Sequence, residues 1–370
     1  MVSSAGTIKP PPILIVGGGL SGLWLAINLI ERGEYVVLFD APKPNAASRI
    51  GAGVINPITG KRAAKTWEVD TFLQYLIQRF ESPYLNSLKY LLQPLQLYRP
   101  FKTAFEANEW AGKSADPNFA PFVHYQFGTK GVPELIDPFG GINIQGYRLQ
   151  VNSFIEKVIP ILSQTGRFQF LNKPLLKSQL FLDSGEFELD GKRESYRFVV
   201  NCTGTDILQD SDWPAKCVVP LKGQLGFCTF EPPTNVDFGL SRAVFVLNEG
   251  SCFLIGSTYE LDFEDESVTD VSTQQLQDKA QELLAIRNIH WLNQQAGLRP
   301  TTFDRKPLIG KHFRYDNYFM LNGLGTKGVL IAPLTANILA DNMLKNIPIP
   351  KELNWNRLLD KKRASILPES

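Results

Sequence analysis

Histidine and paired cysteine are scarce in this chain. The three histidines, His124, His290 and His312, lie far apart, with no second histidine or cysteine at ligand spacing, so we expect no metal site. The cysteines show no CxxC spacing, and most sit in apolar, strand-like runs, which predicts buried thiols in a reducing compartment. They are Cys202, Cys217, Cys228 and Cys252.

Long hydrophobic runs are also missing. No stretch approaches the roughly 20 apolar residues that span a bilayer, so no membrane segment is expected. The first apolar run, Ile13 to Val16, is too short for the core of a signal peptide. We therefore expect a cytoplasmic protein.

The chain also lacks an excess of positive or of negative residues. The 38 Lys and Arg residues nearly balance the 37 Asp and Glu residues, which leaves a formal net charge of +1. Such a chain presents no strong field to nucleic acid or to an anionic membrane surface. The expected partner is therefore a small molecule rather than nucleic acid, and assembly into a homo-oligomer is left open.

The length and the hydrophobic content of the chain, in contrast, are sufficient for more than one hydrophobic core. The chain has 370 residues, of which 44% are hydrophobic. This length exceeds the size at which a single hydrophobic core stops growing. Two domains are therefore expected.

The first residues have the pattern of a dinucleotide-binding unit. Ile13 to Val16 is a continuous β-favouring run, as expected of a strand buried on both faces of a parallel sheet. The sequence Gly17-Gly18-Gly19-Leu20-Ser21-Gly22 follows at once and has the G-x-G-x-x-G spacing. A helix is predicted from Leu20 to Arg32, and Gly33 is its expected C-terminal cap.

Each glycine of this motif has a physical role. Gly17 permits the tight turn, Gly19 lets the backbone approach a pyrophosphate, and Gly22 lets the helix pack closely on the strand. The pyrophosphate would face the positive end of the helix, where Leu20 and Ser21 form the first turn.

A second predicted strand, Tyr35 to Phe39, ends at an acidic residue. Asp40 lies about 20 residues beyond the glycines, as the dinucleotide fingerprint requires. Its carboxylate can accept hydrogen bonds from a ribose and would repel a 2′-phosphate, which argues against NADP. This unit alone does not separate FAD from NAD.

Further segments resemble the D-amino-acid oxidase and glycine oxidase family. They are Ala46-Ala47-Ser48, Gly51-Ala52-Gly53, Arg197 to Gly204, Pro220 to Gly226, Phe253 to Thr258, Ala296 to Asp304, Pro307 to Gly310 and Asn322 to Val329. The resemblance implies FAD as the cofactor. Some relatives attach FAD through a cysteine near the last of these segments, but no cysteine follows Cys252 here. The FAD is therefore expected to be bound non-covalently.

The resemblance also implies which residues contact the cofactor. In the family, a small-residue loop passes the pyrophosphate, a central strand ends beside the adenosine, and a C-terminal glycine-rich loop lies on the flavin ring. The matching positions are Ser48, Gly51, Ala52, Gly53, Thr203, Gly204, Gly297, Gly323, Gly325, Thr326, Lys327, Gly328 and Val329. A helix is expected to begin near Val329, with Pro333 in its first turn and its positive end toward the flavin.

Two basic residues are candidates for chemistry. The resemblance implies that Arg299 binds a substrate carboxylate, for which a guanidinium offers a rigid bidentate fork. The alternative is a structural salt bridge from Arg299 to Asp304. Lys327 either stabilises the reduced flavin or is an exposed surface lysine.

The segment Asn56 to Arg62 departs from the family pattern, which leaves the substrate open. Its basic residues, together with Lys65, either line the mouth of the site or belong to a surface helix, and we favour the surface helix. Farther along, Ser272 to Gln275 has a capping-box pattern that predicts the start of another helix.

The predicted fold is α/β with two domains. The resemblance implies a discontinuous, Rossmann-like FAD-binding domain made of residues 1–80, 145–220 and 297–370. Residues 81–144 and 221–296 would form a substrate domain with a mixed or antiparallel sheet and helices.

The predicted function is that of an FAD-dependent oxidoreductase. It would oxidise the C–N bond of a small amine or amino acid, of the glycine, sarcosine or D-amino-acid type, by hydride transfer to flavin N5. Two alternatives are kept. One is a flavin-dependent tRNA-modifying enzyme or amine dehydrogenase with an electron acceptor other than oxygen, and the other is an FAD-binding protein without enzymatic activity.

Overall fold

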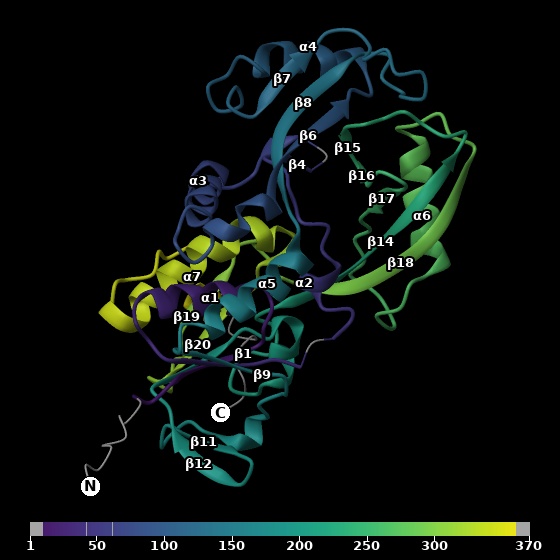
Figure 1. Ribbon diagram of the computed structural model, residues 1–370. Helices are drawn as coiled ribbons and strands as arrows, with labels where there is room; N and C mark the ends of the chain where they lie inside the picture. The colour runs from purple at the N-terminus through teal and green to yellow at the C-terminus, as the bar shows by residue number, and fades with distance from the viewer. Residues whose placement is uncertain (1–9, 42, 61, 360–370) are drawn as a thin grey trace, which may run out of the picture.

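The computed structural model describes residues 10–41, 43–60 and 62–359 (Figure 1). Within these residues the chain builds a six-stranded sheet and a nine-stranded sheet, which are the centres of two lobes. The predicted α/β class is confirmed by this arrangement. The boundaries proposed for the two domains stay a prediction, and strand β3 (Val54–Ile55), within the proposed segment 1–80, belongs to the nine-stranded sheet.

The six-stranded sheet has the first strand of the chain near its centre. Its order is β19 (Leu308–Lys311), β20 (Tyr318–Asn322), β13 (Phe198–Asn201), β1 (Ile13–Val16), β2 (Val36–Phe39) and β9 (Phe168–Leu171). All neighbouring pairs are parallel except β19 with β20, which are antiparallel. This is a doubly wound sheet with one antiparallel edge, so the Rossmann-like prediction is confirmed.

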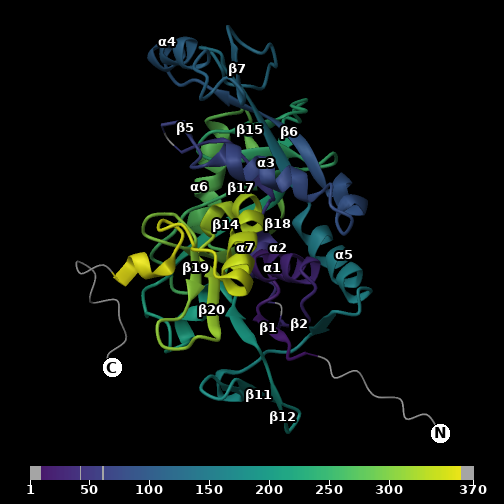
Figure 2. The same ribbon diagram turned by 90° about the vertical axis from the view of Figure 1, so that its left-hand side faces the viewer.

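Both faces of this sheet are covered, which explains its continuous apolar strands. Helices α1 (Leu20–Glu31), α5 (Val151–Ser163) and α7 (Gly328–Lys345) cover one face, and Trp24 of α1 stacks on Phe154 of α5 with ring centroids 5.2 Å apart. Figures 1 and 2 both show α1 and α7 side by side on this face.

The opposite face carries a smaller layer. It contains β10 (Leu180–Phe181), β11 (Glu186–Leu189), β12 (Lys192–Ser195), η2 (Lys177–Gln179), η3 (Gly204–Gln209) and η5 (Trp355–Leu359). Leu14 and Val199 of the sheet pack into the same buried cluster as Trp213 and Trp355. Successive residues of β1 therefore serve two different cores, as the alternation of side chains along a strand requires.

The nine-stranded sheet forms the second lobe. Its order is β18 (Asn288–Thr301), β14 (Val219–Glu231), β17 (Phe253–Gly256), β16 (Phe245–Asn248), β15 (Gly239–Ser241), β6 (Leu92–Pro100), β8 (Gly141–Leu149) and β3 (Val54–Ile55), and β7 (Val123–Gln126) also pairs with β8. The pairs are antiparallel except β15 with β6, which is parallel. The sheet is therefore mixed, as predicted.

Shorter elements complete the two lobes. They are α2 (Ala47–Ile50), β4 (Ile58–Thr59), β5 (Ala64–Lys65), α3 (Val69–Arg79), η1 (Asn86–Leu91), α4 (Ala104–Lys113), α6 (Asp270–Gln281) and η4 (Gly325–Lys327). Helix α3 packs on α7, and α6 packs on one face of β14 and β17. Among the described helices, none is both long and apolar enough to cross a membrane.

Three local predictions were wrong. Helix α6 begins at Asp270 rather than near Ser272, because Thr269 is the N-cap and its side chain accepts a hydrogen bond from the Ser272 amide at 3.3 Å. Pro333 is the sixth residue of α7 and lies in its second turn, because the helix already begins at Gly328.

The third concerns the basic segment after Asn56, which was interpreted as a surface helix. Its described residues form the β4–β5 hairpin instead. Arg62 is exposed, and Lys65 pairs with Asp70 at 2.6 Å. Lys61 lies outside the described residues.

His312 gives the lobe around the six-stranded sheet a predictable pH dependence. Its Nδ1 accepts hydrogen bonds from the Arg314 and Tyr315 amides, so the proton of the neutral ring is on Nε2, which donates to the Asp212 carbonyl at 2.7 Å. Burial lowers the pKa of His312 below its usual value of about 6.5. The neutral His312 ring therefore makes its full contribution to the free energy of unfolding above about pH 6.5. This contribution is lost as the pH falls through the lower pKa that His312 has in the folded protein.

We therefore expect the free energy of unfolding in urea to fall as the pH is lowered from about 7 through and below about 6.5, the usual pKa of histidine. His312→Gln should be less stable than wild type at neutral pH but should lose less stability over this interval. If the free energy of unfolding changed equally with pH in both proteins, groups other than His312 would cause the pH dependence.

Candidate functional site

The glycine-rich turn lies at the carboxyl end of β1, where doubly wound sheets bind ligands. Gly17 has a φ of +107°, and a Cβ there would lie 2.5 Å from the Cys202 carbonyl oxygen. A Cβ at Gly22 would lie 1.9 Å from the Gly17 carbonyl oxygen. Each approach is too close for a side chain, so the motif packs backbone against backbone, as predicted.

The start of α1 is shaped as a site for an anion. Its first amide, that of Leu20, donates to Ser48 Oγ at 3.1 Å. The amides of Ser21 and Gly22 are also in the first turn, where no intrahelical acceptor exists. A Cβ at Gly19 would lie 3.0 Å from Ser48 Oγ. The open side of this turn therefore presents amide donors at the positive end of the helix.

The Asp40 side chain lies beside Gly18 of this turn. Its carboxylate accepts a hydrogen bond from the Gly18 amide, while burial raises the pKa of Asp40 above its usual value. The carboxylate is only partly buried, so it retains room for a second donor such as a ribose hydroxyl.

The C-terminal glycine loop folds onto the same region. A Cβ at Gly328 would lie 3.7 Å from the Leu20 side chain, so the N-termini of α1 and α7 meet. Asn322 donates to the Gly204 carbonyl at 2.9 Å, which joins the end of β20 to the end of β13. Gly325 has a φ of +54° and faces Thr301 of β18. Segments from both ends of the chain thus form one surface.

Most of the predicted cofactor residues are partly accessible at this surface. The partly buried ones are Gly17, Gly19, Ser21, Asp40, Ser48, Ala52, Thr203, Gly204, Gly325, Lys327, Gly328 and Val329, and Thr326 and Gly51 are exposed. A surface of glycines, helix amides and half-buried polar groups fits a long ligand that carries negative charge.

Three predicted glycines are buried and have packing roles. A Cβ at Gly53 would lie 1.9 Å from the Leu149 carbonyl oxygen, and one at Gly297 would lie 2.5 Å from that of Asn45. A Cβ at Gly323 would lie 2.7 Å from the Thr302 side chain. These positions hold the loops of the site against β8 and β18, so they shape the surface from behind.

Arg299 lies on β18 beside this surface. Its Nη1 donates to the Thr258 carbonyl at 3.2 Å, and its guanidinium lies 5.2 Å from the centre of the Tyr259 ring. A Cβ at Gly223 would lie 2.0 Å from Nη1, so only glycine leaves room for the guanidinium there. Burial lowers the pKa of Arg299, while Tyr259 and Glu260 oppose this effect.

The structural alternative for Arg299 is contradicted. Asp304 pairs with Arg357 at 2.8 Å rather than with Arg299. Within the described part of the chain, no carboxylate lies within 4.0 Å of the Arg299 guanidinium. Arg299 is therefore a partly buried cation whose fork is open to an external anion.

Lys327 ends the glycine loop and precedes α7. Burial and the nearby charge of Arg305 lower the pKa of the Lys327 ammonium. The side chain is partly buried, so the interpretation as an ordinary exposed lysine is wrong. Lys327 and the amides at the start of α7 place positive charge at the same end of the surface.

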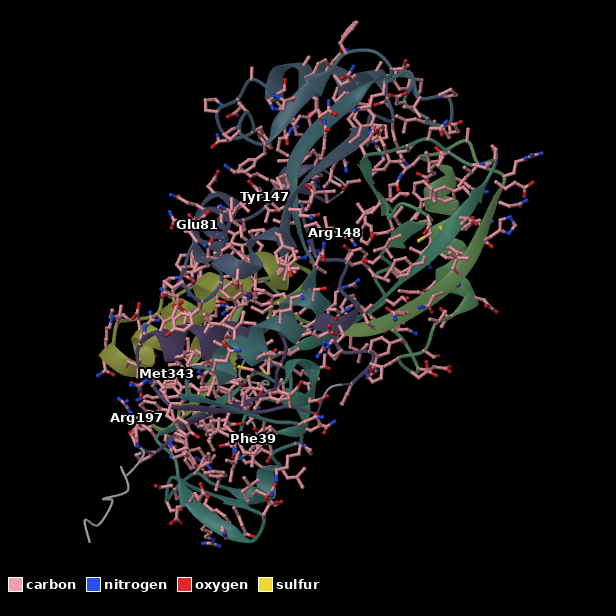
Figure 3. The ribbon with its side chains drawn as sticks, viewed as in Figure 1. Phe39, Glu81, Tyr147, Arg148, Arg197 and Met343 are labelled. Carbon is pink, nitrogen blue, oxygen red and sulfur yellow. The ribbon has the colours of Figure 1, made fainter. Side chains whose placement is uncertain are left out.

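Arg148 connects the site to the second lobe, and Figure 3 labels it on the long strand β8. Its Nε donates to the Ala52 carbonyl at 3.0 Å, and its Nη1 pairs with Glu249 at 2.5 Å. The loop that follows α2 is therefore held by a residue of the nine-stranded sheet.

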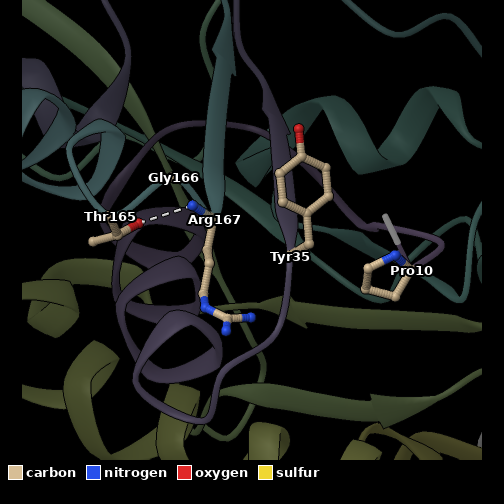
Figure 4. A pocket seen from close by; sticks show the side chains of 5 residues that line it. All are labelled: Pro10, Tyr35, Thr165, Gly166 and Arg167. Atoms are coloured by element: carbon tan, nitrogen blue, oxygen red, sulfur yellow. Dashed lines mark hydrogen bonds between the residues drawn. The ribbon is translucent and has the colours of Figure 1, made fainter. Parts of the chain in front are cut away.

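A hollow of about 300 Å³ lies elsewhere, between Pro10, Tyr35, Thr165, Gly166 and Arg167 (Figure 4). These residues precede β1, β2 and β9, so the hollow is at the amino ends of the parallel strands. Doubly wound sheets bind their ligands at the other end, and none of the predicted site residues lines the hollow. We therefore place the functional site at the glycine turns.

The comparison with protein families bears on the cofactor of this site. Residues 178–342 match the family DAO, described as FAD dependent oxidoreductase. The chain is an FAD-dependent oxidoreductase, as this match indicates. The dinucleotide fingerprint lies before residue 178, outside the matched range, and would supply the other half of the FAD-binding surface.

Curated relatives match this chain at low identity. The tRNA 5-methylaminomethyl-2-thiouridine biosynthesis bifunctional protein MnmC of Haemophilus ducreyi is 23% identical over 95% of this chain and 59% of its own length. Glycine oxidase of Pseudomonas aeruginosa is 31% identical over 36% of this chain and 37% of its own length. The chain thus spans about three fifths of the MnmC protein that it matches.

Solved structures confirm the DAO-type fold. Iminodiacetate oxidase of Chelativorans sp. BNC1 superposes with a TM-score of 0.71 and 19% identity, over 97% of this chain and 100% of the other. L-proline dehydrogenase of P. horikoshii gives a TM-score of 0.75 at 14% identity, over 95% and 98% of the two chains.

The residues at the glycine turns fit FAD. The Gly17 turn and the start of α1 would hold the pyrophosphate, and Asp40 the adenosine ribose. The start of α7 and Lys327 would face the flavin. When bound, FAD supplies a two-electron acceptor for hydride from a carbon atom.

Sequence reasoning missed the groups that hold Arg299. Gly223 and Thr258 lie in two of the segments that resemble the family, but neither was predicted to contact Arg299, and Tyr259 follows the second of these segments. Gly223, which pairs with Gly297 on the neighbouring strand, was the available signal. An isolated glycine within a strand often marks a place where another group approaches the backbone closely.

Gly22 provides a direct test of the cofactor surface. We expect Gly22→Ala to lose bound FAD, because its Cβ would collide with the Gly17 carbonyl and displace the turn. Gly112→Ala in α4 is the matched control, since no atom lies within 4 Å of its Cβ position. Absorbance of the purified proteins near the flavin bands measures the result, and a yellow Gly22→Ala protein would contradict this placement.

Proposed function

We propose that this oxidoreductase oxidises the C–N bond of a small amine or amino acid that carries a carboxylate, as glycine and sarcosine do. The observation that carries the proposal is the open, partly buried guanidinium of Arg299 beside the FAD surface. Glycine, iminodiacetate and proline, the substrates in the names of three similar proteins, all bear a carboxylate on the carbon next to nitrogen.

In this proposal, each residue has a separate task. Arg299 binds the carboxylate through its free edge and thereby fixes the position of the neighbouring carbon. Lys327 and the amides at the start of α7 stabilise the negative charge that the cofactor gains on reduction. No acid or base from the chain is required for the transfer of hydride itself.

A second candidate is an amine attached to tRNA. The match to MnmC extends over 95% of this chain, whereas the match to glycine oxidase covers 36%. The near-neutral charge of the whole chain does not favour RNA, so a small substrate remains our first proposal. We also infer non-covalent FAD and a cytoplasmic location.

A substrate panel distinguishes these candidates. Under anaerobic conditions, glycine, sarcosine, iminodiacetate, proline and a D-amino acid are compared with bulk tRNA for their ability to bleach the flavin. Peroxide on readmission of air indicates an oxidase, and its absence indicates another acceptor. Bleaching by tRNA alone would support the second candidate, and no bleaching at all would favour an FAD-binding protein without activity.

Arg299→Ala tests the proposed carboxylate site. We expect its KM for a bleaching amino acid to rise by about tenfold to hundredfold with FAD retained, since a charge-assisted contact contributes about 1.5–3 kcal/mol. Arg287→Ala, which removes an arginine of 78% side-chain exposure near the far end of the same strand, is the control. Unchanged KM and kcat in Arg299→Ala would refute the assignment.

A further inference from the structure

Lys222 is a charged residue buried in the second lobe, and no role has been derived for it so far. Its exposed fraction is 1%, and it is among the largest fully buried side chains of the described residues. It lies on β14, next to Gly223, over which the Arg299 guanidinium is placed. A buried ammonium is costly unless it is paired, so its surroundings call for an explanation.

Lys222 and Arg299 lie on opposite faces of the sheet. In the antiparallel register of β14 and β18, Leu221 is opposite Arg299 and Lys222 is opposite Leu298. Side chains alternate along a strand, so Lys222 points away from the Arg299 face. It points to the side that is covered by α6 and the segment before it.

Glu260 is the partner of Lys222. The two residues exchange backbone hydrogen bonds, from the Lys222 amide to the Glu260 carbonyl at 2.9 Å and back at 3.0 Å. Their side chains lie on the same face, with Nζ and Oε2 3.9 Å apart. Among the described residues, Glu260 is the carboxylate within 4.0 Å of Nζ. The Lys222 charge also acts on Asp265, where hydrogen bonds and then this charge lower the pKa.

Glu260 is held firmly in this position. Its Oε1 accepts a hydrogen bond from Thr258 Oγ1 at 2.8 Å and another from Ser272 Oγ of α6. The Gln224 amide donates to the same Thr258 hydroxyl at 2.8 Å. The carboxylate therefore cannot turn away from the sheet without breaking several hydrogen bonds.

The segment of residues 258–260 also contacts Arg299. The Thr258 carbonyl accepts the hydrogen bond from Arg299 Nη1, and the Tyr259 ring lies against the guanidinium. Residues 258–260 thus contact Arg299 on one face of the sheet and Lys222 on the other. The Glu260 charge also acts on Arg299, because it opposes the effect of burial on the pKa of that guanidinium.

We propose that Lys222 is a positioning residue for the substrate site: it neutralises Glu260, so that the charge of Arg299 remains available to the carboxylate of a substrate. This inference rests on the proposed function, since it assumes that Arg299 binds a carboxylate. Without Lys222, the Glu260 carboxylate would be the uncompensated anion nearest to Arg299 and would compete with the substrate.

Neutral substitutions separate this electrostatic role from a merely structural one. Lys222→Met keeps the length of the side chain but leaves Glu260 unpaired. The double variant Lys222→Met with Glu260→Gln removes both charges, and replacing both members of a buried pair is often tolerated. Lys222→Arg restores the charge and is the conservative rescue.

The readout is the binding of sodium glycolate, a carboxylate without an amine, to the FAD-loaded protein by titration calorimetry, together with KM and kcat. We expect Lys222→Met to weaken glycolate binding by about tenfold, with KM raised in parallel and kcat nearly unchanged. The double variant and Lys222→Arg should return to within about threefold of wild type. In an Arg299→Ala background, Lys222→Met should have no further effect.

Glu31→Gln is the matched control for a broken ion pair. Glu31 pairs with Arg79 at 2.5 Å, has a side-chain exposure of 18%, and lies at the far end of α1. This variant should lose stability but should bind glycolate like wild type.

Two outcomes overturn the proposal: glycolate binding that is unchanged in Lys222→Met, or a double variant that binds as weakly as Lys222→Met. The second outcome would show that the pair only supports the fold, and the double variant also answers the question if Lys222→Met fails to fold. Failure of the proposed function is distinct, because glycolate binding would then be insensitive to Arg299→Ala as well.

Discussion

The close contact between the Gly17 turn, the start of α1 and the end of β13 is the constraint on which the site depends. A Cβ at Gly17 or Gly22 would lie within 2.5 Å of a backbone carbonyl oxygen, so the segments meet without side chains between them. This contact brings Gly17, just before α1, beside Cys202 and Thr203 at the end of β13. The glycine loop before α7 closes on the same point, because Gly328 lies against Leu20. The positive ends of two helices thereby meet at one place, which favours an anionic ligand there.

Much of this half of the molecule could be predicted from the sequence, because its signals are local. The strand, glycine turn, helix and acid of residues 13–40 follow one another without interruption, and helix α1 begins at Leu20 as expected. The parallel order around β1 follows from the same pattern. The errors were also local: Thr269 caps α6 ahead of the predicted start, and Pro333 falls one turn later in α7. In each case the helix extends farther toward its N-terminus than the motif indicated.

The surroundings of Arg299 could not be predicted in this way, because they depend on register. Whether Lys222 shares a face with Arg299 is decided by which residues of β14 and β18 are opposite each other, and that pairing shifts at Phe227 and Cys228. The contacts of Thr258 and Glu260 follow from an irregular segment after β17, where a hydroxyl replaces a backbone acceptor. In the sequence, the same residues are an apolar strand followed by an acidic loop, which describes their composition but not their partners.

The two faces of the β14–β18 pair have different electrostatic requirements. On the site face, Arg299 must keep an uncompensated charge, which is tolerable only because it is partly accessible and is supported by a carbonyl and an aromatic ring. On the α6 face, burial is nearly complete, so Lys222 requires a carboxylate partner. Glu260 also acts on Arg299 through the strand. In the role proposed for Lys222, the pair on the buried face sets how much charge remains on the open face. Under that proposal, a change in polarity under α6 would be transmitted to Arg299 without any residue of the site face being altered.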